Sequence, residues 1–159
     1  MEFKTADLYD QHTEYIRVCE PLFGDYGGLV RFAGAVATVK CFEDNTQVKA
    51  ALAEPGQGRV LVVDAGGSLR CAMLGDVLAT GAVTNGWTGV VINGCIRDSG
   101  ELADMELGVK ALGTIPRKSE RRGEGQRDIP VTVAGVTFHP GDWVYCDEDG
   151  VVVADRALF

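Results

Sequence analysis

The sequence predicts an α/β fold in which a mixed sheet ends in antiparallel hairpins. Two short continuous apolar runs, RVLVVD at 59–64 and TGVVIN at 88–93, are typical of strands buried on both faces. Helical patterns alternate with these runs, an order that indicates parallel strands joined by crossovers. From 129 to 154 apolar and polar residues alternate between turn dipeptides, which predicts hairpins.

The N-terminal half predicts two helices and two strands. Residues 5–15 favour a short helix capped by Thr5, and residues 27–42 favour a strand in which Gly34 could form a bulge. Asn45 precedes a second helix that stops at Pro55-Gly56. The apolar run after it ends in Gly66-Gly67 and predicts the first buried strand.

The C-terminal half continues the alternation. Asp76 begins a helical pattern through Trp87, the second buried strand follows, and residues 99–112 are predicted to be helical or partly helical. The charged, glycine-containing stretch 117–128 indicates an exposed loop. Because neither a repeat nor a linker divides the chain, residues 1–159 are expected to form a single domain. Turns are predicted at Ala134-Gly135, Pro140-Gly141 and Asp149-Gly150.

Composition and charge exclude several classes of protein. With 46% hydrophobic and 24% charged residues the chain is of ordinary globular type, and its net charge of −8 argues against nucleic-acid binding. No apolar run approaches the roughly 18 residues of a membrane span, and the polar N-terminus resembles no signal peptide. Five cysteines without a CxxC pair favour a reducing compartment, so a cytoplasmic location is expected.

The motifs also argue against several catalytic classes. The two histidines, His12 and His139, are far apart and form no HxxxH pair, so a zinc hydrolase site is not expected. We expect both to be surface or hydrogen-bonded loop residues. The GxSxG elbow, the GxGxxG fingerprint and the P-loop are absent.

Acidic and arginine side chains instead gather at predicted strand ends, where ligands usually bind in α/β sheets. A helix is predicted to start at Gly75, Asp76, Val77 and Leu78, and the free backbone amides there are suited to binding a carboxylate. Arg97 could grip a carboxylate or keto oxygen, and Asp98 offers a hard oxygen ligand for Mg²⁺ or Mn²⁺. Glu101 would share a face with Asp98 if the chain is helical there, and could orient a water bound to the ion.

A purely structural interpretation competes with this one. Asp76 could serve only as a helix cap or first-turn acid, which would stabilise the helix by roughly 0.5–2 kcal/mol. Arg97 and Glu101 could form an i, i+4 ion pair that contributes only about 0.3–0.5 kcal/mol.

The spacing D-x20-R-D-x2-E, preceded by Gly75, resembles the RraA-like family. That family contains the regulator of ribonuclease E activity A and the class II 4-hydroxy-4-methyl-2-oxoglutarate aldolases. The resemblance extends over nearly the whole chain, through VCEPLF, VKCFEDN, GRVLVVDAGGS and GVTFHPGDWVYCDEDGVVV. It implies a layered α/β/β sandwich of the swivelling phosphohistidine-domain type and a ring-like homotrimer with its active site near a subunit boundary.

The resemblance implies two functions. Members with the full motif are metal-dependent lyases that act on 2-keto acids and yield pyruvate, as aldolases and as oxaloacetate decarboxylases. For them Asp98 would bind the divalent ion, Arg97 and the amides of residues 75–78 the keto acid, and Asp76 and Glu101 would orient waters. Members that regulate ribonuclease E lack the aspartate after the arginine. Because Asp98 is present, the resemblance favours the lyase, although VCEPLF and VKCFEDN are more similar to the regulators.

Overall fold

A computed structural model describes residues 2–159 and has at its centre a sheet whose middle strands run parallel. The in-register pairs match the apolar runs 59–64 and 88–93, which confirms the predicted buried strands and their crossovers. The parallel strands are, in spatial order, β3 (Phe32–Lys40), β4 (Val60–Asp64), β6 (Gly89–Ile96) and β7 (Gly108–Thr114). Three short strands extend the sheet: β2 (Gly24–Asp25) pairs with β7, β5 (Ala72–Leu74) with β6, and β8 (Gln126–Arg127) with β3.

Strand β3 connects this sheet to a second layer. Its residues 36–40 pair with β4, whereas residues 32–35 pair antiparallel with the second layer. The bulge considered at Gly34 is wrong, because the register is continuous there. A side chain is excluded for a different reason: a Cβ at this position would lie 2.4 Å from the carbonyl oxygen of Gly58. The second layer contains β11 (Trp143–Asp147), β12 (Gly150–Ala154) and β1 (Arg17–Val18).

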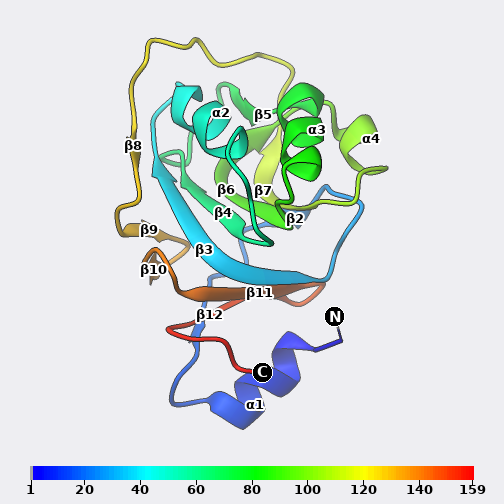
Figure 1. Cartoon of the computed structure of the whole chain (residues 1–159), viewed down its shortest axis with the longest axis vertical. Helices are drawn as coiled ribbons and strands as arrows, with labels where there is room; N and C mark the ends of the chain where they lie inside the picture. The colour runs from blue at the N-terminus through cyan, green and yellow to red at the C-terminus, as the bar shows by residue number, and fades with distance from the viewer. Residues whose placement is uncertain (1) are drawn as a thin grey trace.

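Helices and strands are stacked in layers, as Figure 1 shows. One apolar core lies between the helices and the parallel sheet, and a second lies between that sheet and the C-terminal strands. The expected layered α/β/β arrangement is thus present, and the hairpin of β9 (Val131–Val133) and β10 (Val136–Phe138) packs in the second core. The helices over the parallel sheet are α2 (Thr46–Leu52), α3 (Asp76–Thr84) and α4 (Ser99–Leu102).

The N-terminal helix α1 (Thr5–His12) packs outside the second layer, where both chain ends lie. Thr5 was expected to cap this helix, but the cap residue is Lys4 and no side chain caps it. The amide and the hydroxyl of Thr5 instead donate to the buried carboxylate of Asp147, at 2.8 and 2.6 Å. These bonds tether α1 to β11, a contact between positions 142 residues apart.

Several predicted boundaries are wrong in the middle of the chain, among them the helix predicted through Trp87, which ends at Thr84. The stretch 99–112 was predicted to be helical or partly helical, but helix α4 spans only its first four residues and residues 108–112 belong to strand β7. The charged Lys110 interrupts the apolar run of this strand in the sequence, although its side chain is buried and only 2% exposed. Its Nζ lies 2.8 Å from Asp25 and donates to the carbonyl oxygen of Asp147. Strand β6 also continues beyond Asn93, through a register shift, to Ile96.

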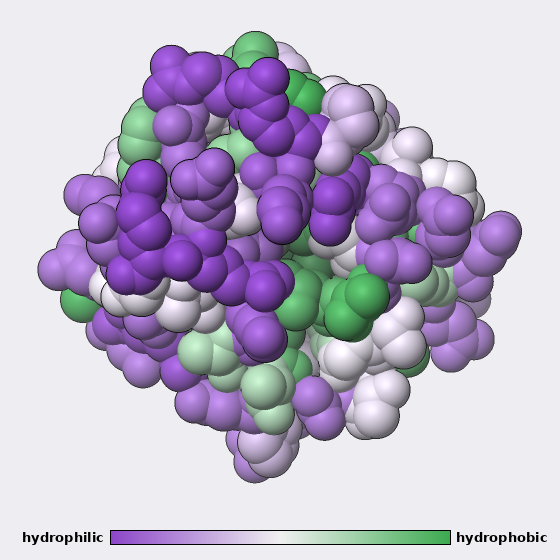
Figure 2. Space-filling view, turned by 90° about the horizontal axis from the view of Figure 1, so that it is seen from above, coloured by the Kyte–Doolittle hydropathy of each residue, from purple (hydrophilic) through white to green (hydrophobic). Residues whose placement is uncertain are grey.

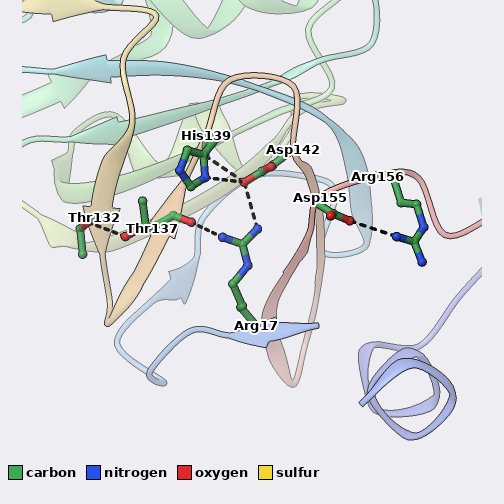
Figure 3. A network of polar contacts seen from close by, with 7 residues as sticks. All are labelled: Arg17, Thr132, Thr137, His139, Asp142, Asp155 and Arg156. Atoms are coloured by element: carbon green, nitrogen blue, oxygen red, sulfur yellow. Dashed lines mark hydrogen bonds and ion pairs between the residues drawn. The ribbon is translucent and has the colours of Figure 1, made fainter. Parts of the chain in front are cut away.

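The C-terminal turns are held by polar contacts around Asp142, shown in Figure 3. Asp142 is 6% exposed, and its carboxylate accepts hydrogen bonds from the amide of His139 at 2.9 Å and from the guanidinium of Arg17 at 3.0 Å. Arg17 also donates to the carbonyl oxygen of Thr137, so it ties β1 to the turn before β11. His139 is therefore a hydrogen-bonded loop residue, as expected. None of the helices within residues 2–159 combines the length and apolarity required to cross a bilayer.

Candidate functional site

A cleft of about 530 Å³ opens at the carboxyl ends of β5 and β6. Figure 2 looks down on this end of the molecule, where hydrophilic side chains predominate and a small group of hydrophobic atoms is exposed near the centre. The cleft brings together the start of α3 and Arg97, as the motif predicted. It is lined by Asn45, Lys49, Ala72, Leu74, Gly75, Asp76, Val77, Leu78, Arg97, Lys118, Ser119, Glu120 and Arg121.

Gly75 is the point where the two halves of the motif meet. It is the N-cap of α3, and the Arg97 and Asp98 side chains pack directly over it. A Cβ at this position would lie 2.7 Å from Asp98 Oδ2 and 3.3 Å from Arg97 Nε. The amide of Asp76 donates to the same carboxylate oxygen at 2.9 Å. A side chain at this position would therefore displace the Asp98 carboxylate, and the motif spacing places both charged side chains against the helix start.

Asp98 adopts a left-handed backbone conformation, with φ of 56° and ψ of 41°. This region is uncommon for residues other than glycine, although aspartate tolerates it better than most. Such conformations often occur at ligand sites, where the surroundings hold them in place. Here the turn comes directly after β6, and the Asp98 carboxylate returns to the start of α3.

The start of α3 and Arg97 together favour an anion. The amides of Val77 and Leu78 lie in the first turn, where no intrahelical acceptor exists, and the helix dipole attracts negative charge there. Arg97 is held by a backbone bond from its amide to the carbonyl oxygen of Leu74, at 2.9 Å. Its side chain forms no ion pair with any residue in the range 2–159. The guanidinium is thus available to a ligand.

The structural alternatives explain less of this geometry. Arg97 and Glu101 do not form the i, i+4 ion pair. Asp76 does not cap α3, but it is an acid of the first turn, as the structural alternative allowed. Asp98 and Glu101 do not share a helical face, because α4 begins after Asp98. Neither Asp98 nor the exposed Glu101 is among the residues that line the cleft, although Asp98 packs over Gly75, which does line it. The roles of both acids stay predictions.

The opposite wall of the cleft was not predicted as part of a site. Buried Asn45 donates from Nδ2 to the carbonyl oxygen of Met73 at 3.1 Å, and its Oδ1 accepts from Ser119 at 2.7 Å and Arg121 at 3.0 Å. The adjacent Asp44 accepts the amides of Arg122 and Glu124. Residues 44 and 45 therefore fasten the loop 117–125 over the cleft.

The Asp44 carboxylate is charged at neutral pH. Its burial alone would raise its pKa, but hydrogen bonds from the hydroxyl and amide of Thr46 and from two loop amides outweigh burial and lower the pKa to about 2. The sequence offered a weak signal for this wall, the cations of RKSERR at 117–122. It did not indicate that Ser119 would form a hydrogen bond with Asn45, which is 74 residues away.

A divalent ion of the Mg²⁺ type fits the available donors. Asp98 Oδ2 is engaged by an amide, which leaves Oδ1 free of any hydrogen bond from residues 2–159. In that part of the chain, no three His, Cys, Asp or Glu side chains cluster as a metal cage. Mg²⁺ keeps most of its waters and takes one or two protein carboxylates, whereas structural zinc needs four protein ligands. Asp98 is the residue that would hold such an ion.

The chain is similar to proteins of one family over nearly its full length. A family model described as Aldolase/RraA, in the RraA-like group, matches residues 5–153. A protein from Alkalilimnicola ehrlichii named "Putative 4-hydroxy-4-methyl-2-oxoglutarate aldolase" is 58% identical over 158 residues, which are 99% of this chain and 98% of that protein.

Two solved structures share the fold. The RNA-processing inhibitor RraA from Thermus thermophilis has 43% identity and a TM-score of 0.96, over 100% of this chain and 96% of that one. A Geobacillus kaustophilus structure described as S-adenosylmethionine: 2-dimethylmenaquinone methyltransferase has 51% identity and the same TM-score, over 98% and 97%. The motif, the layered fold and the family match agree, and the chain belongs to the RraA-like family.

Proposed function

We propose that this chain is a divalent-metal-dependent carbon–carbon lyase that acts on 2-keto acids and yields pyruvate. The reactions would be aldol cleavage of 4-hydroxy-4-methyl-2-oxoglutarate and decarboxylation of oxaloacetate. The observation that carries the proposal is the Asp98 carboxylate, held over Gly75 beside Arg97 at the start of α3. This arrangement offers one free hard oxygen ligand next to donors for a carboxylate and a keto oxygen.

Both reactions leave the electrons of the broken bond on a pyruvate enolate, so the barrier depends on negative charge at the C2 oxygen. Arg97 would bind the keto acid by charge-assisted hydrogen bonds and neutralise part of that charge. The first-turn amides, including those of Val77 and Leu78, would hold the C1 carboxylate. A divalent ion held by Asp98 would supply Lewis-acid stabilisation to the same oxygen.

Proton transfer would involve water at the cleft. In decarboxylation the C3–C4 bond breaks, CO₂ leaves, and the enolate takes a proton at C3. In aldol cleavage a base must first remove the proton from the C4 hydroxyl. The partly exposed carboxylate of Asp76 lines the cleft and would orient the water that exchanges these protons. Decarboxylation needs no base to begin, so oxaloacetate is the less demanding substrate.

The names of relatives support the aldolase more than the alternatives. Several proteins at 53–58% identity carry the aldolase name. The cationic cleft suits a small carboxylic acid better than the uncharged quinone ring of the methyltransferase name. Binding to ribonuclease E is a second candidate, favoured by the likeness to the inhibitor RraA.

We also expect a homotrimer, in which a neighbouring subunit would cover the exposed Val77 at the start of α3.

Pyruvate release tests the proposal. Purified protein is assayed with oxaloacetate and with 4-hydroxy-4-methyl-2-oxoglutarate, in Mg²⁺ and in EDTA, beside Asp98→Ala and a metal-only blank. Turnover above the blank, lost in EDTA and in the variant, is expected. A wild type that never exceeds the blank with either substrate would contradict the lyase, and ribonuclease E binding would then be the first candidate.

A further inference from the structure

We propose that Lys49 and Arg121 bind the distal carboxylate of the substrate and make the cleft selective for dicarboxylic 2-keto acids. This inference rests on the proposed function, because it assumes that Arg97 and the start of α3 hold the keto-acid end. It assigns a role to the wall of the cleft that the motif does not include.

The two walls lie on opposite sides of β5. On one side, the carbonyl oxygen of Leu74 accepts the amide of Arg97 from β6. On the other side, the carbonyl oxygen of Met73 accepts Asn45 Nδ2. Successive carbonyls of an extended strand point to opposite sides, so Arg97 and Asn45 flank the strand end that forms the cleft floor. A ligand over this floor can therefore contact both walls at once.

Arg121 is positioned by its neighbours. Its Nε donates to Asn45 Oδ1, which is fixed in turn by Ser119, and both of these residues are buried. The two terminal nitrogens of the guanidinium have no acceptor within residues 2–159. A guanidinium that is anchored through Nε and free at its ends loses less side-chain entropy when it binds a carboxylate.

Lys49 reinforces the same wall. It follows Asn45 by one helical turn, and its amide donates to the carbonyl oxygen of Asn45 at 3.0 Å. Positions four apart share a helix face, so Lys49 and Asn45 lie on the side of α2 that lines the cleft. Its ammonium forms no ion pair with residues 2–159.

Charge in the cleft opposes the charge of the protein. The lining holds four cations, Lys49, Arg97, Lys118 and Arg121, and two acids, Asp76 and Glu120, whereas the whole chain carries −8. One carboxylate at Arg97 leaves the far wall with three cations, Lys49, Lys118 and Arg121, against the single acid Glu120. A second carboxylate, two or three bonds beyond the keto carbon, would meet them.

Binding of two matched keto acids tests this inference without requiring turnover. 2-Oxoglutarate and 2-oxopentanoate have the same carbon chain and differ only in the distal carboxylate. Titration calorimetry with Mg²⁺ compares the wild type, the Lys49→Met/Arg121→Met double variant, and a Lys4→Met control at the far end of the molecule. We expect the wild type to prefer 2-oxoglutarate by about 10- to 100-fold, the range of a charge-assisted hydrogen bond.

The double variant should lose this preference because its affinity for 2-oxoglutarate falls while its affinity for 2-oxopentanoate does not. Its KM for the aldol substrate should rise. Lys4→Met should bind like the wild type. Equal binding of the two acids by the wild type, or an equal loss of both in the double variant, would overturn the inference. Failure of the lyase itself would show separately, as absence of pyruvate release above the metal-only blank.

Discussion

Replacing Gly75 by alanine tests whether the motif works through its packing. The backbone at this N-cap has φ of −133°, a conformation that any residue adopts, so alanine meets no backbone penalty. The effect must come from the added Cβ alone. It would lie 2.7 Å from Asp98 Oδ2 and 3.3 Å from both Cγ and Nε of Arg97.

The size of the displacement follows from these contacts. Ordinary contact begins at 3.4 Å, so the Asp98 carboxylate must retreat by roughly 0.7 Å. This movement lengthens its 2.9 Å bond from the amide of Asp76, an interaction of a type that contributes about 1.5–3 kcal/mol. Misplacing reacting groups by about 1 Å can reduce a rate by about 10²-fold. We therefore expect Gly75→Ala to lower kcat/KM for pyruvate release by about 30- to 100-fold.

The assay includes a control on the same helix. Gly81 lies in α3, and apart from its chain neighbours and the nearby helix backbone a Cβ added there would meet no atom within 4 Å, so Gly81→Ala should keep full activity. It should also raise stability by about 0.8–1 kcal/mol from helix propensity, or roughly 2–4 °C in Tm. Both variants are measured for pyruvate release and thermal unfolding. A folded Gly75→Ala protein with activity within about threefold of the wild type would refute the packing argument.

Three further predictions concern the loop anchor and the thiols. The pKa of Asp44 is about 2 in the folded protein, below its ordinary value of 3.8. The charged carboxylate therefore stabilises the fold above about pH 4, and this contribution is lost as the pH falls towards 2. The stability difference between the wild type and Asp44→Asn, from denaturant melts, should shrink over that range; a constant difference would contradict the anchor. Asn45→Ala should speed tryptic cleavage within residues 117–127, and unchanged cleavage would mean that the loop is held by other contacts. Burial raises the pKa of Cys19 and Cys41 to about 12, so iodoacetamide should label the native protein much more slowly than the urea-unfolded one, and equal rates would be inconsistent with buried thiols.

Local sequence patterns correctly predicted the buried parallel strands and the hairpin turns. The runs 59–64 and 88–93 are strands because parallel strands bury both faces, and the hairpin turns occur at their glycine dipeptides. The failures have long-range causes. Lys110 conceals a strand because a distant carboxylate and carbonyl pair with its ammonium. Gly34 lacks a side chain because another backbone segment approaches it.

The candidate site divides in the same way. One half follows from the motif spacing, because strand ends of a parallel sheet meet at one edge. It consists of Gly75 to Leu78 and Arg97, which line the cleft, and of Asp98, which packs against the start of α3. The other half depends on Asn45 and Ser119, whose hydrogen bond joins segments 74 residues apart. Nothing local in the sequence specifies that pairing, so the far wall of the cleft emerges only from the structure.

The most direct test of the central claim is whether Asp98 holds a divalent ion beside the keto-acid site. Mn²⁺ binding is titrated by electron paramagnetic resonance with the wild type and with Asp98→Ala, each with and without pyruvate. We predict one Mn²⁺ per wild-type chain, bound more tightly when pyruvate is present, and neither effect in the variant. Equal Mn²⁺ binding by the two proteins would contradict the assignment of Asp98 as the metal ligand.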